Sequence, residues 1–326
     1  MNALLNPAFW SFVGVVAGIF AIFSLGLQLQ FGFGGLLNFG HVAFMAVAAY
    51  TMAILVVNVG LALWLAAVAA IGAAVLFGLL LGLPTLRLRA DYLAITTIAF
   101  GEIVRFTALN ESRLTGGPQG TINLLGQGKA ASYNGEWLAF QRQVQERLQS
   151  LVGEVADKDF TMLVIVWTVV LVLIVLLQMV VHSPWGRVLR SIREDEDAAA
   201  ALGKNVFRYK LQALMLGAAL GGIAGLFFAF QFSFFSPADF DPLTTFFAWV
   251  IVILGGSARN WGVPVGALVF GVIFAGTRFF DFPPLSYFDS AERAFLRLII
   301  VGLILIGLMA FRPQGIFGKR EEMVLE

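Results

Sequence analysis

The sequence predicts an all-α protein, a polytopic transmembrane helical bundle of about eight to ten spans, some of them broken or re-entrant. Of its 326 residues, 59% are hydrophobic and 13% are charged, whereas a soluble domain carries about 25% charged residues. The mean hydropathy is +0.87. The apolar residues are gathered into long runs, and a helix needs roughly 20 apolar residues to cross a bilayer. A helix that is apolar on every side must be buried all round, so several such runs indicate a membrane protein.

The apolar runs are predicted to form helices within one membrane domain that covers residues 1–326. They are 9–31, 41–58, 61–83, 92–109, 160–182, 211–232, 246–256, 264–280 and 294–311. The second and seventh runs are short or flanked by glycine, and we expect one of them to be re-entrant. The chain begins without Lys or Arg in residues 1–10, so no cleavable signal peptide is predicted.

The short connections that are rich in Lys and Arg predict the orientation in the membrane. Basic residues occur in 84–91, in 183–210 and after residue 311, and the predicted spans place all three stretches on one side. Short basic loops face the cytoplasm. The sequence therefore predicts a multi-pass protein of the inner (plasma) membrane, with 183–210 in the cytoplasm and 110–159 as an outward-facing loop insert.

The outward-facing insert contains one predicted polar helix, over residues 136–156. Leu138, Val144, Leu148 and Leu151 would form its apolar stripe, because these residues recur at helical spacing. We expect a solvated helix that lies on the outer face of the membrane domain.

Two glycine-rich stretches resemble each other and predict an internal repeat. Gly34-Gly35 is followed by Asn38-Phe39-Gly40, and Gly255-Gly256 is followed by Asn260-Trp261-Gly262. Such stretches break a membrane helix, which is tolerated only where protein or a water-filled cavity satisfies the backbone. Transporters use broken helices to bind substrate. The alternative interpretation is that these are ordinary packing glycines, since the chain contains 35 glycines.

Polar residues in the apolar runs are candidates for a translocation path. They are Asn38, His41, Tyr50, Thr96, Thr97, Glu102 and Asn260. Glu102 and Arg105 share a helix face at i, i+3, and a carboxylate at membrane depth normally faces a partner or a cavity. The alternative for Glu102 is a structural ion pair that locks helix packing, and for His41 it is a buried hydrogen-bonding residue. No metal site is expected, because the chain has no cysteine and only two histidines, far apart.

The segment 183–210 combines both signs of charge. Arg187, Arg190 and Arg193 recur at i, i+3, i+6, four acidic residues follow at 194–197, and alanines then lead to Gly203, which suits a helix C-terminus. An interfacial amphipathic helix would explain the arginines alone. The acidic cluster favours a protein partner, because acidic residues contribute little to topology.

Six stretches resemble the permease subunits of ATP-binding-cassette importers for branched-chain amino acids. They are LLNFGHVAFMAVAAYT (36–51), LRADYLAITTIAFGEIVR (88–105), LTGGPQG (114–120), SPWGRVLRSIREDEDAAAALGKNVFRYKL (183–211), VILGGSARNWGVPVGA (252–267) and RPQGIFG (312–318). The importer signature Glu-Ala-Ala-x-x-x-Gly is matched by residues 197–203, with aspartate in place of glutamate. The insert at 127–158 is longer and more polar than the family pattern.

The resemblance implies that 183–210 is a cytoplasmic coupling segment that docks on an ATPase. Its coupling residues would be Arg187, Arg190, Arg193, Glu196, Asp197, Ala198, Ala199 and Gly203. The expected partners are ABC ATPase subunits, a second homologous permease, an extracytoplasmic solute-binding protein and membrane lipid, but no nucleic acid. The chain lacks the Walker A pattern, so we expect no catalysis by this chain, no bound cofactor and ATP hydrolysis on a separate subunit.

The function implied by the resemblance is ATP-driven import of branched-chain or other neutral amino acids. One alternative is an ABC importer permease for urea or short amides. A second is an ion-coupled secondary transporter, with Glu102 as the coupling group. A non-transport membrane protein such as a lipid enzyme is the weakest interpretation, because no nucleophile–base set stands in the spans.

Overall fold

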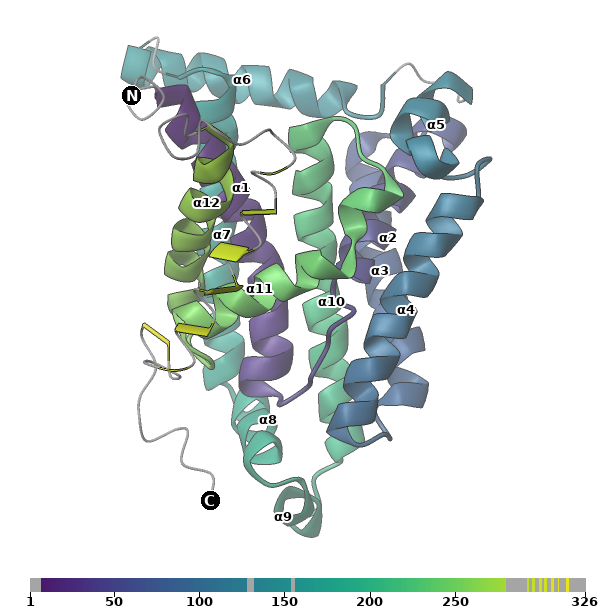
Figure 1. Cartoon of the computed structure of the whole chain (residues 1–326), viewed down its shortest axis with the longest axis vertical. Coiled ribbons are helices and arrows are strands. Elements are labelled where there is room, and N and C mark those ends of the chain that lie inside the picture. Colours follow the sequence, from purple (N-terminus) through teal and green to yellow (C-terminus); the bar gives the residue numbers. More distant parts are fainter. Residues whose placement is uncertain are drawn as a thin grey trace.

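The computed structural model describes residues 7–127, 132–153 and 156–279, together with scattered positions between 292 and 316. Throughout these described residues the regular elements are helices, and no strand occurs. Most of the long helices run alongside one another, with the short helices α8 and α9 at one end of the bundle and α6 across the opposite end (Figure 1). The predicted all-α polytopic bundle is confirmed.

Six helices within the described part of the chain are long and apolar enough to cross a membrane. They are α1 (Pro7–Leu27) with its extension η1 (Gln28–Phe33), α2 (Val42–Ile54) with η2 (Leu55–Val59), α3 (Leu63–Thr85), α4 (Ala90–Asn110), α7 (Lys158–His182) and α10 (Val206–Phe232). Two shorter apolar helices follow, α11 (Pro242–Gly255) and α12 (Gly262–Phe279). These helices match the first eight predicted runs within a few residues. The ninth run, 294–311, lies largely outside the described residues.

The segments that connect these apolar helices also contain helices. They are η3 (Gly117–Gln119), α5 (Thr121–Gln127), α6 (Gly135–Val152), α8 (Pro184–Glu194), α9 (Glu196–Ala201) and η5 (Pro237–Phe240).

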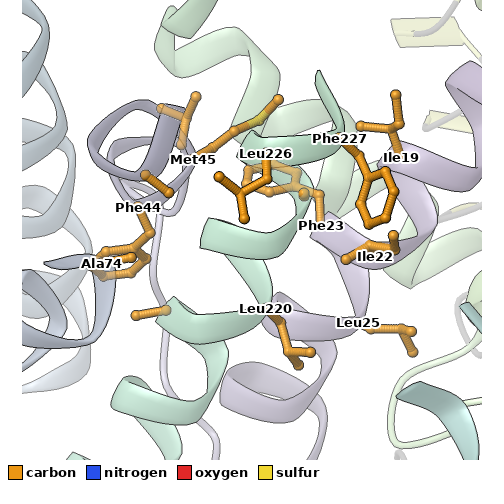
Figure 2. Close-up of a cluster of buried hydrophobic side chains, with 14 of the residues drawn as sticks. Ile19, Ile22, Phe23, Leu25, Phe44, Met45, Ala74, Leu220, Leu226 and Phe227 are labelled. Carbon is orange, nitrogen blue, oxygen red and sulfur yellow. The ribbon is translucent and has the colours of Figure 1, made fainter. Parts of the chain in front are cut away.

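The centre of the bundle is built on α1 and α10. Helix α1 packs against α7, α10, α11 and α12, whereas α10 packs against α2 and α3 as well. Figure 2 shows the shared core, in which Ile19, Ile22, Phe23 and Leu25 of α1 meet Leu220, Leu226 and Phe227 of α10, with Phe44 and Met45 of α2 and Ala74 of α3 alongside. A Cβ atom at Gly225 would lie 2.2 Å from the Met45 carbonyl oxygen. The glycine therefore sets the close approach of α10 to α2, as small residues do between membrane helices.

Two helices depart from simple membrane spans. After η1 the chain runs without regular helix to His41, mostly buried, before α2 begins. Helix α11 lies across the bundle (Figure 1). Its 14 residues extend about 21 Å at 1.5 Å per residue, too short for a hydrocarbon core of about 30 Å. Of the two runs for which a re-entrant segment is predicted, the second forms a candidate span, whereas the seventh, α11, is too short to cross.

Helix α6 packs on the bundle by a face that only partly coincides with the predicted stripe. Trp137 stacks on Phe230 of α10 with ring centroids 4.3 Å apart, and Gln141 is also buried, whereas Leu151 is exposed. The buried Tyr133 hydroxyl, just before α6, donates to the Ala229 carbonyl oxygen at 2.9 Å, and burial raises the pKa of this phenol. Leu138, Val144 and Leu148 of the predicted stripe are partly buried, and Leu138 packs against the main core. The stripe prediction therefore holds for three of its four residues, and the aromatic contact of Trp137 adds to it.

Candidate transport and coupling sites

The first break, between η1 and α2, is held by Asn38. Its Nδ2 donates to Gln30 Oε1 at 2.9 Å, and its Oδ1 accepts from the Gly40 backbone N–H at 2.9 Å. Gln30 Nε2 in turn donates to the Leu214 carbonyl oxygen of α10 at 3.1 Å. Asn38 is only 1% exposed. The amide therefore substitutes for the helical hydrogen bonds that the glycines remove.

Threonine side chains from two other helices complete this break. Thr97 Oγ1 of α4 accepts from the Phe39 N–H at 3.0 Å, and Thr245 Oγ1 of α11 accepts from the Val42 N–H at 3.0 Å. The first N–H groups of a helix have no partner within that helix, so Thr245 satisfies the start of α2. A Cβ atom at Gly40 would lie 1.8 Å from the Thr97 carbonyl oxygen. Sequence reasoning missed Thr245, because nothing in its own run marks it as a cap for a helix 200 residues earlier.

His41 is fully buried at the same break. Its ring lies 4.7 Å from the Phe23 ring and 5.6 Å from the Phe44 ring, between centroids. The Nε2 atom is 3.2 Å from the Phe23 carbonyl oxygen. The structure therefore brings together three of the predicted path residues, Asn38, His41 and Thr97, in a packed, hydrogen-bonded cluster.

The second break, between α11 and α12, lies against η1, the helix that precedes the first break. Gln28 Nε2 of η1 donates to the Gly256 carbonyl oxygen at 3.2 Å, and a Cβ atom at Gly32 would lie 2.8 Å from the Ala258 nitrogen. Asn260 is buried, and its Nδ2 donates to Gln178 Oε1 of α7 at 3.2 Å. Asn260 also lines a cavity of about 340 Å³ together with Gln178, Arg190 and Phe33. The second glycine-rich stretch thus contacts η1, just before the first stretch, and the repeat itself stays an interpretation.

The remaining path candidates lie apart from the breaks. Thr96 Oγ1 donates to the Tyr92 carbonyl oxygen of its own helix at 2.7 Å. Glu102 and Arg105 form the ion pair expected from their spacing, with Arg105 Nη2 2.6 Å from Glu102 Oε2. The side chains of Arg105 and Glu102 are 21% and 26% exposed. Both members of the ion pair belong to α4. This ion pair therefore does not link two helices, as the alternative of a structural pair that locks helix packing requires.

A cavity that sequence reasoning missed lies between α2, α3 and α4. It measures about 320 Å³ and includes only Tyr50 of the predicted path residues. The lining is Ala46, Val47, Tyr50, Thr51 and Ile54 of α2, Phe77 of α3, Phe100, Ile103, Val104, Thr107 and Ala108 of α4, and Thr115. The lining positions on α2 and α4 recur mostly three or four apart. That spacing could have indicated two facing helix surfaces, but every membrane helix carries several such faces.

The segment 183–210 folds as two short helices with defined ends. Asp195 is the N-cap of α9, and its Oδ1 accepts from the Ala198 N–H at 2.9 Å. Gly203 adopts φ 78° just after α9, and the N–H groups of Gly203 and Lys204 donate to the carbonyl oxygens of Ala200 and Ala199. This is the Schellman arrangement, which favours glycine. The prediction that Gly203 ends the helix is confirmed.

The three arginines of α8 bind the bundle. Arg187 donates to the His182 carbonyl oxygen at 3.1 Å and Arg190 to the Val181 carbonyl oxygen at 2.8 Å, both at the end of α7. Arg193 donates to the carbonyl oxygen of Gly32, in η1. The Arg190 guanidinium also lies 5.9 Å from the centroid of the Phe33 ring. The arginine ridge therefore connects α8 to the first break.

The tip of the segment is exposed. Asp197 and Ala198 are exposed, whereas Ala199 is buried, and Leu202 is 80% exposed. Glu196 forms an ion pair with Lys210. Both residues line a cavity of about 370 Å³ that also includes Arg87 and Arg89. Two of the predicted basic stretches thus lie at one end of the bundle, as the topology requires. Within the described residues, no group of three potential metal ligands lies together.

Comparison with known proteins gives one consistent result. Residues 10–309 match the family described as "Branched-chain amino acid transport system / permease component". The Escherichia coli (strain K12) protein described as "High-affinity branched-chain amino acid transport system permease protein LivM" is 33% identical over 310 residues, which cover 93% of this chain and 69% of that relative. The probable LivM protein of Methanocaldococcus jannaschii is 22% identical over 340 residues, covering 93% of this chain and 91% of the relative.

A further relative is similar over half of the chain. The Salmonella typhimurium permease protein LivH is 26% identical over 162 residues, covering 49% of each protein. No solved structure matches significantly. All three relatives are described as transport components and not as enzymes. With its multi-pass helical bundle and a match over nearly its whole length, the chain belongs to the family of permease components of branched-chain amino acid transport systems.

Proposed function

We propose that the chain is a transmembrane subunit of an ATP-driven importer for branched-chain or other neutral amino acids. The observation that carries the proposal is the pair of helices α8 and α9. Their arginines hold the bundle at the end of α7 and at Gly32, while Asp197 and Leu202 are exposed at the tip. An exposed acidic and apolar tip on a firmly anchored base is suited to a protein partner. We assign that partner as an ATPase subunit.

The contacts of α8 give the proposed coupling a physical route. Movement of α9 with the ATPase would move Arg193, whose guanidinium holds the Gly32 carbonyl oxygen. Gly32 packs on the second break at Ala258. A displacement of α8 therefore acts on both breaks, and ATP favours one conformation of the bundle by binding the two conformations with different affinity. ATP hydrolysis belongs to the partner, and no bound cofactor is assigned to this chain.

The surface of α4 supports a second permease as the neighbour in the membrane. Among the six candidate spans, α4 has the lowest mean hydropathy and the smallest buried share. It also carries the partly exposed Glu102–Arg105 pair. Charged groups facing lipid are costly, so this surface is better covered by protein. The relative named LivH, which matches half of this chain, indicates a homologous permease as the occupant.

The outer face and the substrate follow from the remaining observations. We place α6 outside the cell, where its exposed polar face would receive a solute-binding protein. The relatives are described as permeases for branched-chain amino acids, which favours that substrate class over urea or short amides.

The contacts of Glu102 bear on the alternative of ion coupling. Both oxygens of Glu102 accept from Arg105. A carboxylate held in this way is poorly suited to ion coupling.

The proposal is tested by reversing charge at the tip. Asp197→Arg combined with Gly203→Glu should abolish both uptake of labelled leucine and co-purification of the ATPase with this chain. The matched control is Asp159→Arg, which reverses a charge at the start of α7, at the opposite end of the bundle. ATPase binding that is unchanged by the double substitution would refute the assignment. Uptake that survives ATP depletion but stops when the proton gradient is dissipated would favour the ion-coupled alternative.

A further inference from the structure

One residue that lines the cavity between α2, α3 and α4 has a buried hydroxyl without a partner within the described residues. Tyr50 is 5% exposed, and its hydroxyl oxygen is buried and makes no hydrogen bond. The ring is held by Phe235 at 5.0 Å and Phe240 at 5.8 Å, between centroids. A phenol normally finds a hydrogen-bond partner when it is buried. Tyr50 thus adds one buried hydroxyl without a protein partner to the residues that line the cavity.

Three threonines also line the cavity, Thr51, Thr107 and Thr115, and the hydroxyls of the last two are already used. Thr107 Oγ1 donates to the Ile103 carbonyl oxygen at 2.7 Å, and Thr115 Oγ1 donates to the Ala108 carbonyl oxygen at 2.6 Å. Most of the remaining lining is aliphatic or aromatic, from Ala46 to Val104. The cavity thus offers an apolar wall with a polar contact at one side. Most small-molecule sites have this composition.

The opening of the cavity lies on α4. Ile103 and Thr107 line the cavity and are exposed, on the helix that we assign to face the second permease. A molecule in the cavity could therefore exchange with the space between the two permeases. Thr115 places the cavity in the half of the bundle nearest the outward-facing insert.

We propose that this cavity receives the branched aliphatic side chain of the transported amino acid, with the Tyr50 hydroxyl as a hydrogen-bonding contact for its polar end. The proposal rests on the proposed function and adds a residue-level account of substrate choice. A lipid acyl chain would also fill an apolar cavity. It would leave the Tyr50 hydroxyl without a partner, so the amino acid accounts for one more observation.

The test narrows the cavity and separately removes the hydroxyl. Val104→Phe narrows it, and Val172→Phe makes the same change on the exposed surface of α7. Tyr50→Phe removes the hydroxyl and keeps the ring, and Tyr92→Phe is its control at an exposed tyrosine of α4. Each variant replaces the native chain in its own cells, with the other transporter components intact. Maximal uptake rates of labelled leucine, valine and alanine are measured at saturating concentration and normalised to the amount of protein in the membrane.

Val104→Phe should lower leucine uptake at least about 10-fold relative to alanine, because filling an apolar site discriminates by size. Tyr50→Phe should lower all three rates by about fivefold, as for one lost neutral hydrogen bond. Both controls should stay within about twofold of the native chain. Equal losses for the three amino acids in Val104→Phe, or rates that are all unchanged as expected for a lipid-filled cavity, would overturn the proposal.

Failure of the proposed function gives a different result. If the chain does not transport leucine, deletion of its gene leaves leucine uptake intact. The deletion strain is therefore measured first, and the size preference of Val104→Phe is interpreted against it.

Discussion

Gly40 provides the sharpest test of the broken-helix geometry. A Cβ atom at this position would lie 1.8 Å from the Thr97 carbonyl oxygen, whereas ordinary contact begins at 3.4 Å. The backbone of α4 or of the break would have to move by roughly 1.6 Å, and the obstacle is main chain that no rotamer change can remove. We therefore expect Gly40→Ala to lower the free energy of unfolding by at least about 1–3 kcal/mol, the cost of overpacking a well-packed core.

The assay is thermal unfolding of the purified chain in detergent, followed by tryptophan fluorescence. Gly72→Ala is the matched control, because a Cβ atom at Gly72 on α3 has nothing within 4 Å. Replacing a helical glycine by alanine stabilises by about 0.5–1 kcal/mol where there is room, so the two variants should shift in opposite directions. A Gly40→Ala protein as stable as Gly72→Ala would show that α4 does not contact the break as described.

Two further predictions concern charged groups. Arg193→Ala should leave ATPase co-purification intact but lower the ATP-dependent uptake rate about 10-fold. The reason is that the substitution removes the contact with Gly32 and leaves the exposed tip unchanged. The control is Arg208→Ala, which alters an exposed cation, and an equal loss of uptake in this variant would contradict the coupling route. Glu102→Gln should lower the free energy of unfolding by about 2–3 kcal/mol, because it leaves Arg105 unpaired. Glu102→Gln with Arg105→Gln should recover most of this loss, and both variants are measured by the same unfolding assay with the chain reconstituted in lipid bilayers. Equal losses in the single and double variants would argue against the ion pair.

The spans could be predicted from sequence because their cause is local. Each run from 9–31 to 264–280 is bounded by polar residues or glycines, and the membrane decides its length. The ends of α9 were also predictable, since Asp195 and Gly203 act on backbone groups within a few residues of themselves. These elements depend on neighbours in the sequence.

The candidate site was less predictable because its causes are distant in sequence. Asn38, His41 and Thr97 were correctly singled out as unusual, but their partners lie on η1 and α1 or in the break itself. Thr245 looks ordinary within an apolar run, yet it satisfies the first N–H of α2. The cavity beside Tyr50 requires the relative rotation of α2 and α4 about their axes, which packing determines and periodicity alone does not.

The hydrogen bond from Gln28 to Gly256 also affects the order in which the chain can mature. The two residues are 228 positions apart, and synthesis at about 5–20 residues per second separates them by roughly 10–45 s. Membrane helices insert before they associate, so the Gln28 amide is in the bilayer long before its acceptor exists. Two of the four helices that α1 packs against, α11 and α12, are also synthesised after α10. A chain that stops after α10 leaves this amide unpaired and the α11-facing side of α1 open, a state that membrane proteases and chaperones can distinguish from the finished protein.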